Sequence, residues 1–179
     1  MSGYGAKQLA DAFRTVRRNT VQIAEDIPES KYDFVAADGS RSVADLLKHI
    51  VHAPALAEDM HRVRRVTTLQ GYDFPAVTGR ARAAEKLSAT KAQIVGSLKS
   101  EGERFAHWLE SLTPEFLAET FTDHAGQNPR TRFESLLSPK EHEMHHRGQL
   151  MLIERMLGIV PHLTRVMEER MRARQQAAV

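Results

Sequence analysis

The sequence predicts an all-α protein, a four-helix bundle with an additional C-terminal helix. Apolar residues recur at steps of three and four residues in four long stretches, which is the pattern of amphipathic helices. Alternating strand patterns, internal repeats and low-complexity tracts are absent from the sequence. Four helices that each carry one apolar face and are joined by short connections bury those faces in a bundle. At 179 residues the chain is expected to form one domain over 1–179.

The first two long helices are predicted over 6–25 and 43–66. Ser42 suits an N-cap, and Asp45, three residues later, suits its reciprocal partner. Pro54 lies inside the second stretch and removes one backbone hydrogen bond, so a kink is predicted there.

The third long helix is predicted over 81–111, between two loops. The first loop, 71–79, contains glycine, proline and aspartate. The second, 119–130, contains glycine, asparagine and proline. We therefore expect both segments to lack regular structure.

The fourth long helix is predicted over 132–157, opened by a capping box that begins at Thr131. Pro139 leaves two alternatives, one kinked helix or two short helices end to end. A final helix with a polar face is expected over about 162–174.

Composition and charge exclude several classes of protein. No apolar run approaches the roughly 20 residues of a membrane helix, and no secretory signal pattern opens the chain, so a cytoplasmic location is expected. Net charge is only +2, with acids and bases mixed along the same segments and no aromatic stacking set beside the basic clusters. We therefore expect neither a membrane nor a nucleic acid as partner.

The sequence contains no cysteine. This excludes disulfide bonds, thiolate metal sites and a cysteine nucleophile. Any thiol chemistry must use a thiol supplied from outside the chain.

The sequence contains nine histidines, which are its candidate metal ligands and catalytic groups, and they are densest in the segment 141–150. His142 and His146 are four residues apart, so both imidazoles lie on the core-facing stripe of their helix, together with Gln149. Two such ligands leave a third to come from a neighbouring helix. His49 lies at the margin of the apolar face of the second helix and offers it, whereas His52 points roughly opposite.

Two other interpretations of these histidines stay open. His142 and His146 can be buried core residues hydrogen-bonded to other groups. The segment 142–146 also matches HExxH, the metalloprotease helix in which the glutamate, here Glu143, is the general base. A third ligand for that site would be a downstream glutamate, Glu168 or Glu169. The remaining histidines are expected at the surface or at helix caps: His61, His107, His124 and His162.

Three stretches together resemble the DinB/YfiT-like family of metalloenzymes. Residues 27–34 look like the family's first loop, 41–50 like the start of its second helix, and 142–150 like its H-x-x-x-H-R-G-Q signature. The closing segment 156–161 also fits. The similarity covers about residues 6–162 in family order.

The resemblance implies a four-helix bundle, often a homodimer, that binds a divalent transition metal, zinc or nickel, through His49, His142 and His146. Gln149 is a candidate to orient the imidazoles, and Glu143 and Arg147 are either similar helpers or packing residues.

Characterised relatives include glutathione-, mycothiol- and bacillithiol-dependent S-transferases and maleylpyruvate isomerases. The resemblance therefore implies transfer of an external low-molecular-weight thiol to an electrophilic small molecule. The alternatives are a metal-dependent hydrolase, including the HExxH peptidase, or a non-catalytic helical dimer that acts as a binding protein.

Overall fold

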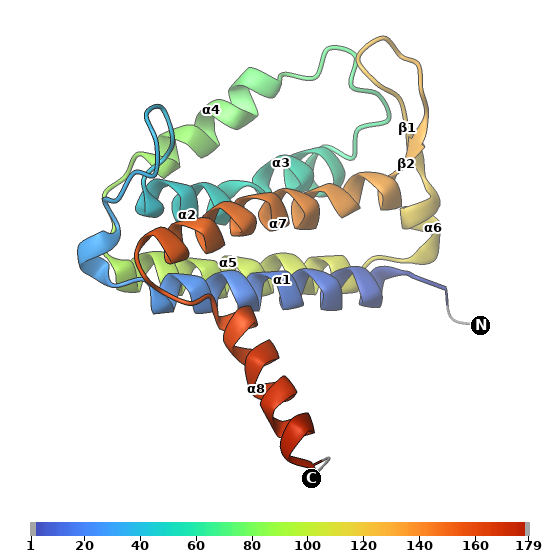
Figure 1. The fold of residues 1–179 in the computed structure, drawn as a ribbon. Coiled ribbons are helices and arrows are strands. Elements are labelled where there is room, and N and C mark those ends of the chain that lie inside the picture. The colour runs from blue at the N-terminus through green and yellow to red at the C-terminus, as the bar shows by residue number, and fades with distance from the viewer. Residues whose placement is uncertain (1–2, 178–179) are drawn as a thin grey trace.

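The computed structural model describes residues 3–177 and is mostly helical (Figure 1). Four long helices form a bundle: α1 (Ala6–Asp26), α2 (Val43–His52), α5 (Lys91–Glu110) and α7 (Arg132–Met156). In Figure 1 α1 and α5 lie side by side in one layer, and α2 and α7 form the other. The predicted all-α class and four-helix bundle are confirmed.

The core of the bundle is divided into two large apolar clusters. One is centred on residues such as Ile23, Leu47 and Leu98, and the other contains Phe13 and Phe105. Between them α1 carries Arg17, a buried arginine that is 4% exposed. Gly102 of α5 makes room for it, because a Cβ at this glycine would meet Arg17 Cγ at 2.6 Å.

The second predicted helix is interrupted where Pro54 predicts a kink. The chain continues as a short helix α3 (Ala55–Glu58) and a π-helical turn η2 (Asp59–Val63). The helical segment therefore ends at Val63 rather than at residue 66. A 3-10 turn, η1 (Glu29–Lys31), lies in the connection between α1 and α2.

The predicted third helix over 81–111 is wrong, because two helices occupy this region. α4 (Phe74–Glu85) begins inside the segment 71–79 that is predicted as a loop, and α5 begins only at Lys91. The Asp73 side chain accepts from Ala76 N and starts α4, and Thr90 accepts from Gln93 N and starts α5. Two caps thus divide one expected helix into two.

The segment 119–130, predicted as a loop, follows the short helix α6 (Pro114–Ala118) and forms a small hairpin with one strand near each of its ends. Its strands, β1 (Thr120–Phe121) and β2 (Arg130–Thr131), pair in antiparallel fashion. Thr131 then forms the predicted capping box and opens α7, which remains a single helix through Pro139. This decides between the two alternatives for the fourth helix.

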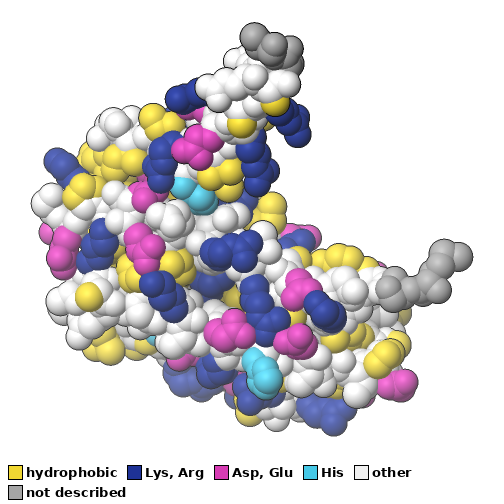
Figure 2. All heavy atoms as spheres, turned by 90° about the horizontal axis from the view of Figure 1, so that it is seen from below, with side chains coloured by type: hydrophobic (Ala, Val, Ile, Leu, Met, Phe, Trp, Pro, Cys, Tyr) yellow, Lys and Arg dark blue, Asp and Glu magenta, His cyan; other side chains and the backbone are white. Residues whose placement is uncertain are grey.

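α8 (His162–Ala177) projects away from the bundle, as Figures 1 and 2 both show. It is slightly longer than the predicted 162–174. On the face seen in Figure 2 basic and acidic side chains are interspersed, in agreement with the mixed charge pattern of the sequence. Among residues 3–177 no helix is long and apolar enough to span a bilayer.

Candidate metal centre

His49, His142 and His146 come together between α2 and α7. Nε2 of His142 lies 3.3 Å from Nε2 of His49 and 3.2 Å from Nε2 of His146. The candidate ligand atoms of the three residues all lie within 4.8 Å of one another. Three nitrogens bound tetrahedrally to one zinc ion at about 2.1 Å are about 3.4 Å apart, so the cluster has the dimensions of a metal site.

Two side chains fix the protons of this cluster. His49 donates from Nδ1 to Glu85 Oε1 at 2.9 Å, and His146 donates from Nδ1 to Gln149 Oε1 at 2.8 Å. With the proton assigned to Nδ1 by these partners, each Nε2 carries a lone pair. Both lone pairs point toward Nε2 of His142.

A proton on Nε2 of His142 could serve only one of these two lone pairs at a time. Its Nδ1 is buried and has no hydrogen-bond partner within residues 3–177. A cation at the centre of the cluster satisfies all three Nε2 atoms together, whereas hydrogen bonding within the cluster does not. The chemistry of the donor set therefore fits a metal ion.

The two clustered histidines of α7, His142 and His146, are in the neutral form, which is the form that binds metals. Burial lowers the pKa of His142 to about 4, and the neighbouring histidines and Arg41 act in the same direction. Burial also lowers the pKa of His146, against the opposing effect of the hydrogen bond that His146 donates to Gln149. At neutral pH both imidazoles are uncharged.

The role predicted for Gln149 as an orienting group agrees with its contact to His146. Glu85, which orients His49, has no counterpart in the sequence-based prediction. It lies at the C-terminal end of α4, the helix that was not expected. A signal for it exists in the sequence, because Phe74, Val77 and Glu85 share one face of a helix with the intervening positions 78, 81 and 82.

The peptidase interpretation does not fit the structure. Glu143 points into the bundle, is 2% exposed, and pairs with Arg17 through Nε–Oε1 and Nη2–Oε2 contacts of 2.9 Å. It is therefore a packing residue, committed away from the histidine cluster. Glu168 and Glu169 are exposed on the projecting α8 and are not among the clustered ligands.

Several expectations for the other histidines need correction. His61 is fully buried: its Nδ1 accepts from Arg132 at 3.0 Å and its Nε2 donates to Ser135 Oγ at 2.9 Å. His162 is also buried, 3.4 Å from Asn19 Oδ1. His107 and His124 are exposed, as expected.

His52 does not point into open solvent; it is half-buried and lies in a cavity wall. This cavity, of about 370 Å³, adjoins the histidine cluster, because His49 and His142 are also in its wall. Three helical stripes with spacings of three and four residues enclose it. The segment α2–η2 contributes His49, His52, Ala53, Leu56, Ala57 and Met60. The helix α4 contributes Phe74, Val77, Thr78, Ala81, Arg82 and Glu85. The helix α7 contributes Ser135, Ser138, Pro139 and His142.

A family model described as the DinB superfamily matches residues 12–150. The chain belongs to the DinB superfamily. This confirms the resemblance that the three sequence stretches indicate. The chain is also 25% identical over 154 residues to the uncharacterized protein YjoA of Bacillus subtilis, with 86% of this chain and 91% of that protein covered.

Solved structures of DinB-like proteins share the fold. YfiT from Bacillus subtilis, described as a probable metal-dependent hydrolase with an unusual four-helix bundle topology, matches at a TM-score of 0.65 and 18% identity over 89% of this chain and 91% of its own. The structure of YjoA matches at 0.62 and 24% identity over 84% and 92%. A DinB-like protein from Bacillus cereus matches at 0.64 and 16% identity over 86% and 93%.

Proposed function

We propose that the protein is a metal-dependent enzyme that acts on small molecules, and that His49, His142 and His146 hold a divalent cation, zinc or nickel. The observation that carries this proposal is the convergence of three imidazole nitrogens whose protons are placed on the far side of at least two rings. The cluster borders a cavity large enough for a small molecule, of about 370 Å³. A buried hydrogen-bonding role for the histidines would not require that cavity.

A divalent cation in a three-histidine site with an open position supplies Lewis acidity and promotes deprotonation of the group that binds it. The protein's own residues perform the remaining tasks. Glu85 and Gln149 keep the Nδ1 protons in place and thereby the Nε2 lone pairs directed at the centre. The apolar side chains of the cavity exclude water from the substrate.

His52 is the second imidazole on the α2 side of the cavity, one helical turn after His49. It has no hydrogen-bond partner in the described part of the chain, and it is not part of the cluster. We assign to it the acceptance of the proton that the incoming nucleophile loses.

The reaction that we propose is transfer of an external low-molecular-weight thiol to an electrophile. Two features support it: the chain has no cysteine of its own, and the cavity wall is mostly apolar, which suits an uncharged electrophilic carbon. Hydrolysis is the second candidate, and the description of YfiT as a probable metal-dependent hydrolase favours it. The two reactions share the same site and differ only in the nucleophile.

Metal content tests the site. Purified protein is loaded with zinc or nickel, desalted, and measured by mass spectrometry of the metal together with calorimetric titration. We expect about one ion per chain in the unaltered protein and in His107→Ala, whose histidine is exposed on α5. His49→Ala should lose it, and full occupancy in that variant would end the three-ligand proposal.

Activity then separates the two reactions. Loaded protein is incubated with monochlorobimane and each of glutathione, mycothiol and bacillithiol, and separately with 4-nitrophenyl esters in the absence of thiol. Conjugation that requires both metal and thiol supports S-transfer. Ester cleavage without thiol supports hydrolysis, and the absence of both reactions would favour the binding-protein alternative.

We also propose that the protein forms a homodimer through α8. This helix projects from the bundle and carries large exposed apolar side chains: Val166, Met167 and Met171. Burying them against a second copy would remove apolar surface from water. Sedimentation analysis should give a dimer for the unaltered protein and a monomer for a variant with Met167→Glu and Met171→Glu; a monomer in both cases would contradict this proposal.

A further inference from the structure

We infer that the cavity beside the histidines takes an amphiphilic anion, a substrate with an apolar body and a carboxylate that is bound by arginines at the cavity rim. This inference rests on the proposed function, because it takes the cavity to be the substrate site. It adds the chemical class of that substrate. Three arginines border the cavity: Arg41, Arg82 and Arg130.

The interior of the cavity selects an apolar body. Its inner wall is formed by aliphatic, aromatic and thioether side chains, among them Leu56, Met60, Phe74 and Val77. Met60 and Val77 are almost fully buried, at 5% and 4% exposure. A hydrocarbon or aryl group placed against such side chains gains the free energy of leaving water.

The arginines at the rim lack acidic partners. Arg41, Arg82 and Arg130 are exposed, and none of them forms an ion pair or a side-chain hydrogen bond with residues 3–177; Arg130 only stacks over the Phe121 ring at 5.0 Å. Glu85 is the acidic residue in the cavity wall, and it is already bonded to His49. Arg41 lowers the pKa of Asp45 and Arg130 that of Glu134, but these two carboxylates already bond to Ser42 and Thr131 at the helix N-termini. The rim therefore carries an excess of positive charge.

Neighbouring arginines outside the cavity behave differently. Arg80, on the same helix as Arg82, pairs with Asp59 at 3.3 Å, and Arg104 of α5 pairs with Glu58 at 2.6 Å. Arg14 of α1 pairs with both Glu103 and Glu110. Ion pairing is frequent outside the cavity but not universal, since Arg18, Arg170 and Arg174 also form none with residues 3–177. What distinguishes the cavity is that three unpaired guanidinium groups border one apolar-lined space, which suggests that a ligand supplies the anion.

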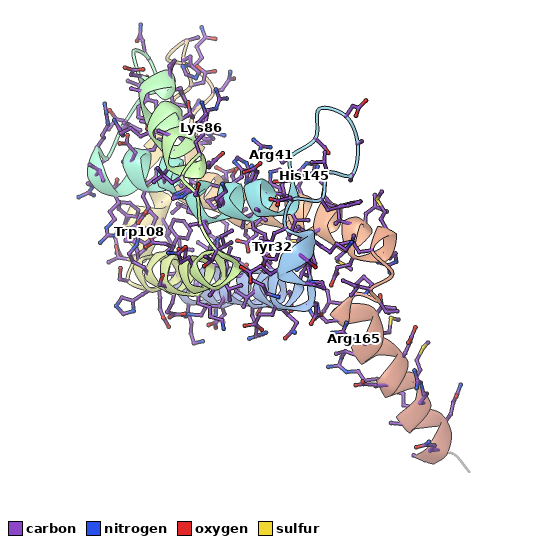
Figure 3. The ribbon with its side chains drawn as sticks, turned by 90° about the vertical axis from the view of Figure 1, so that its left-hand side faces the viewer. Tyr32, Arg41, Lys86, Trp108, His145 and Arg165 are labelled. Carbon is purple, nitrogen blue, oxygen red and sulfur yellow. The ribbon has the colours of Figure 1, made fainter. Side chains whose placement is uncertain are left out.

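The three arginines are distributed along the cavity. Arg82 lies one turn before Glu85, at the histidine end. Arg41 precedes α2 at the same end, where its charge lowers the pKa of His142 and His146. Figure 3 labels Arg41, at the end of the loop that leads into α2. Arg130 lies at the opposite end, over Phe121, which packs with Met60. An anion entering from either end therefore meets a guanidinium group.

The test measures binding rather than turnover. The full chain is first freed of metal with a chelator, so that a carboxylate cannot bind through a cation. Calorimetry then gives dissociation constants for octanoate, 4-phenylbutanoate and indole-3-acetate, each paired with its neutral primary amide. We expect at least one carboxylate to bind about tenfold or more tightly than its amide, because a charge-assisted hydrogen bond is formed only with the acid.

Two variants with the same net charge locate the effect. In the first, Arg41→Met, Arg82→Met and Arg130→Met together should reduce the preference for the carboxylate to less than about twofold while the amide binds as before. In the second, Arg18→Met, Arg170→Met and Arg174→Met remove exposed arginines outside the cavity wall and should leave the preference intact.

Equal binding of every acid and its amide would overturn the inference, as would an equal loss of preference in both variants. The metal proposal is not at stake in either result, because its own test is the metal content of His49→Ala. Repeating the titrations with zinc-loaded protein adds a second comparison. The preference due to the rim arginines should persist there, and a preference that appears only with zinc would contradict the assignment to the arginines.

Discussion

Two groups of polar side chains meet at one turn of α7, one buried and one partly buried, and they differ in how their hydrogen-bonding atoms are satisfied. Glu143 pairs with Arg17, whose remaining donors reach Leu98 O at 2.9 Å and Ile50 O at 3.3 Å. On the neighbouring face of α7, the Nε2 atoms of His142 and His146 face Nε2 of His49 from α2. The hydrogen bonds of the first group are complete within the protein, whereas the second leaves Nδ1 of His142 without a partner within residues 3–177.

The difference follows from the geometry of a helix. Successive side chains are turned by roughly 100°, so Glu143 points toward α1 while its neighbours point toward α2 and the cavity. Buried charges that are fully paired stabilise a particular packing, and truncating one partner is costly. Buried lone pairs directed at one point mark a binding site instead. One turn of helix therefore serves structure on one face and carries the proposed metal site on the other.

The largest effect should come from breaking the complete group. Glu143→Ala leaves the Arg17 guanidinium buried without its carboxylate, and it should lower the free energy of unfolding by about 3–5 kcal/mol. Urea denaturation measures this. The double variant Arg17→Met and Glu143→Leu should recover much of the loss, because apolar side chains of similar volume need no partner. An unchanged midpoint in Glu143→Ala would contradict the assigned role.

Acid should act on a second complete group, the buried His61 with Arg132 and Ser135. Burial first, and then the charges of Arg132 and Arg130, lower the pKa of His61 to about 4. The unfolded chain then binds the additional proton at higher pH than the folded chain, so stability is full above about pH 6.5 and falls as the pH drops toward 4, by up to about 3 kcal/mol. Thermal unfolding across this range should show a weaker dependence in His61→Gln.

Substitution in the histidine cluster should change metal affinity and leave stability nearly unchanged. His142→Ala should leave the stability of the metal-free protein within about 1 kcal/mol, because Nδ1 of this residue has no partner within residues 3–177. The zinc affinity of the His142→Ala variant should fall by more than about 100-fold, a larger loss than is expected when a residue that only orients a ligand is replaced. A variant that unfolds like Glu143→Ala would remove the contrast between the two groups.

The smallest effect should come from the residues that orient the imidazoles. Glu85→Gln weakens the acceptor for His49 Nδ1 and should reduce zinc affinity by about 10-fold to 100-fold. Glu141→Gln is the matched control, because Glu141 is exposed on α7 beside His142. Equal affinities in the two variants would show that the Glu85 contact does not orient the ligand.

The sequence predicted those features that depend on residues close together in the chain. The Thr131 capping box depends on residues within one turn and is found, and the irregularity predicted as a kink at Pro54 is found as the interruption between α2 and α3. The three clustered histidines could also be predicted from the sequence. The i, i+4 spacing of His142 and His146 and the position of His49 at the apolar margin of α2 determine the helix faces on which they lie. What the spacing could not give is the distance between those faces.

Features that depend on contacts between distant segments were not predicted. α4 is rich in alanine and arginine and contains Gly79 and Pro75, so its apolar stripe is weak and only its packing on α2 and α3 stabilises it. Arg17 and Glu143 are separated by 126 positions, and no local pattern joins them. His61 resembled a surface residue because its partners lie on the hairpin side of α7.

The bond between His49 and Glu85 has a mechanical consequence. It is a side-chain link between α2 and the end of α4, the helix that forms the outer wall of the cavity. A cation bound by His49 would thus be linked through one hydrogen bond to the last residue of α4. Metal loading and the stability of this cavity wall are therefore expected to be coupled.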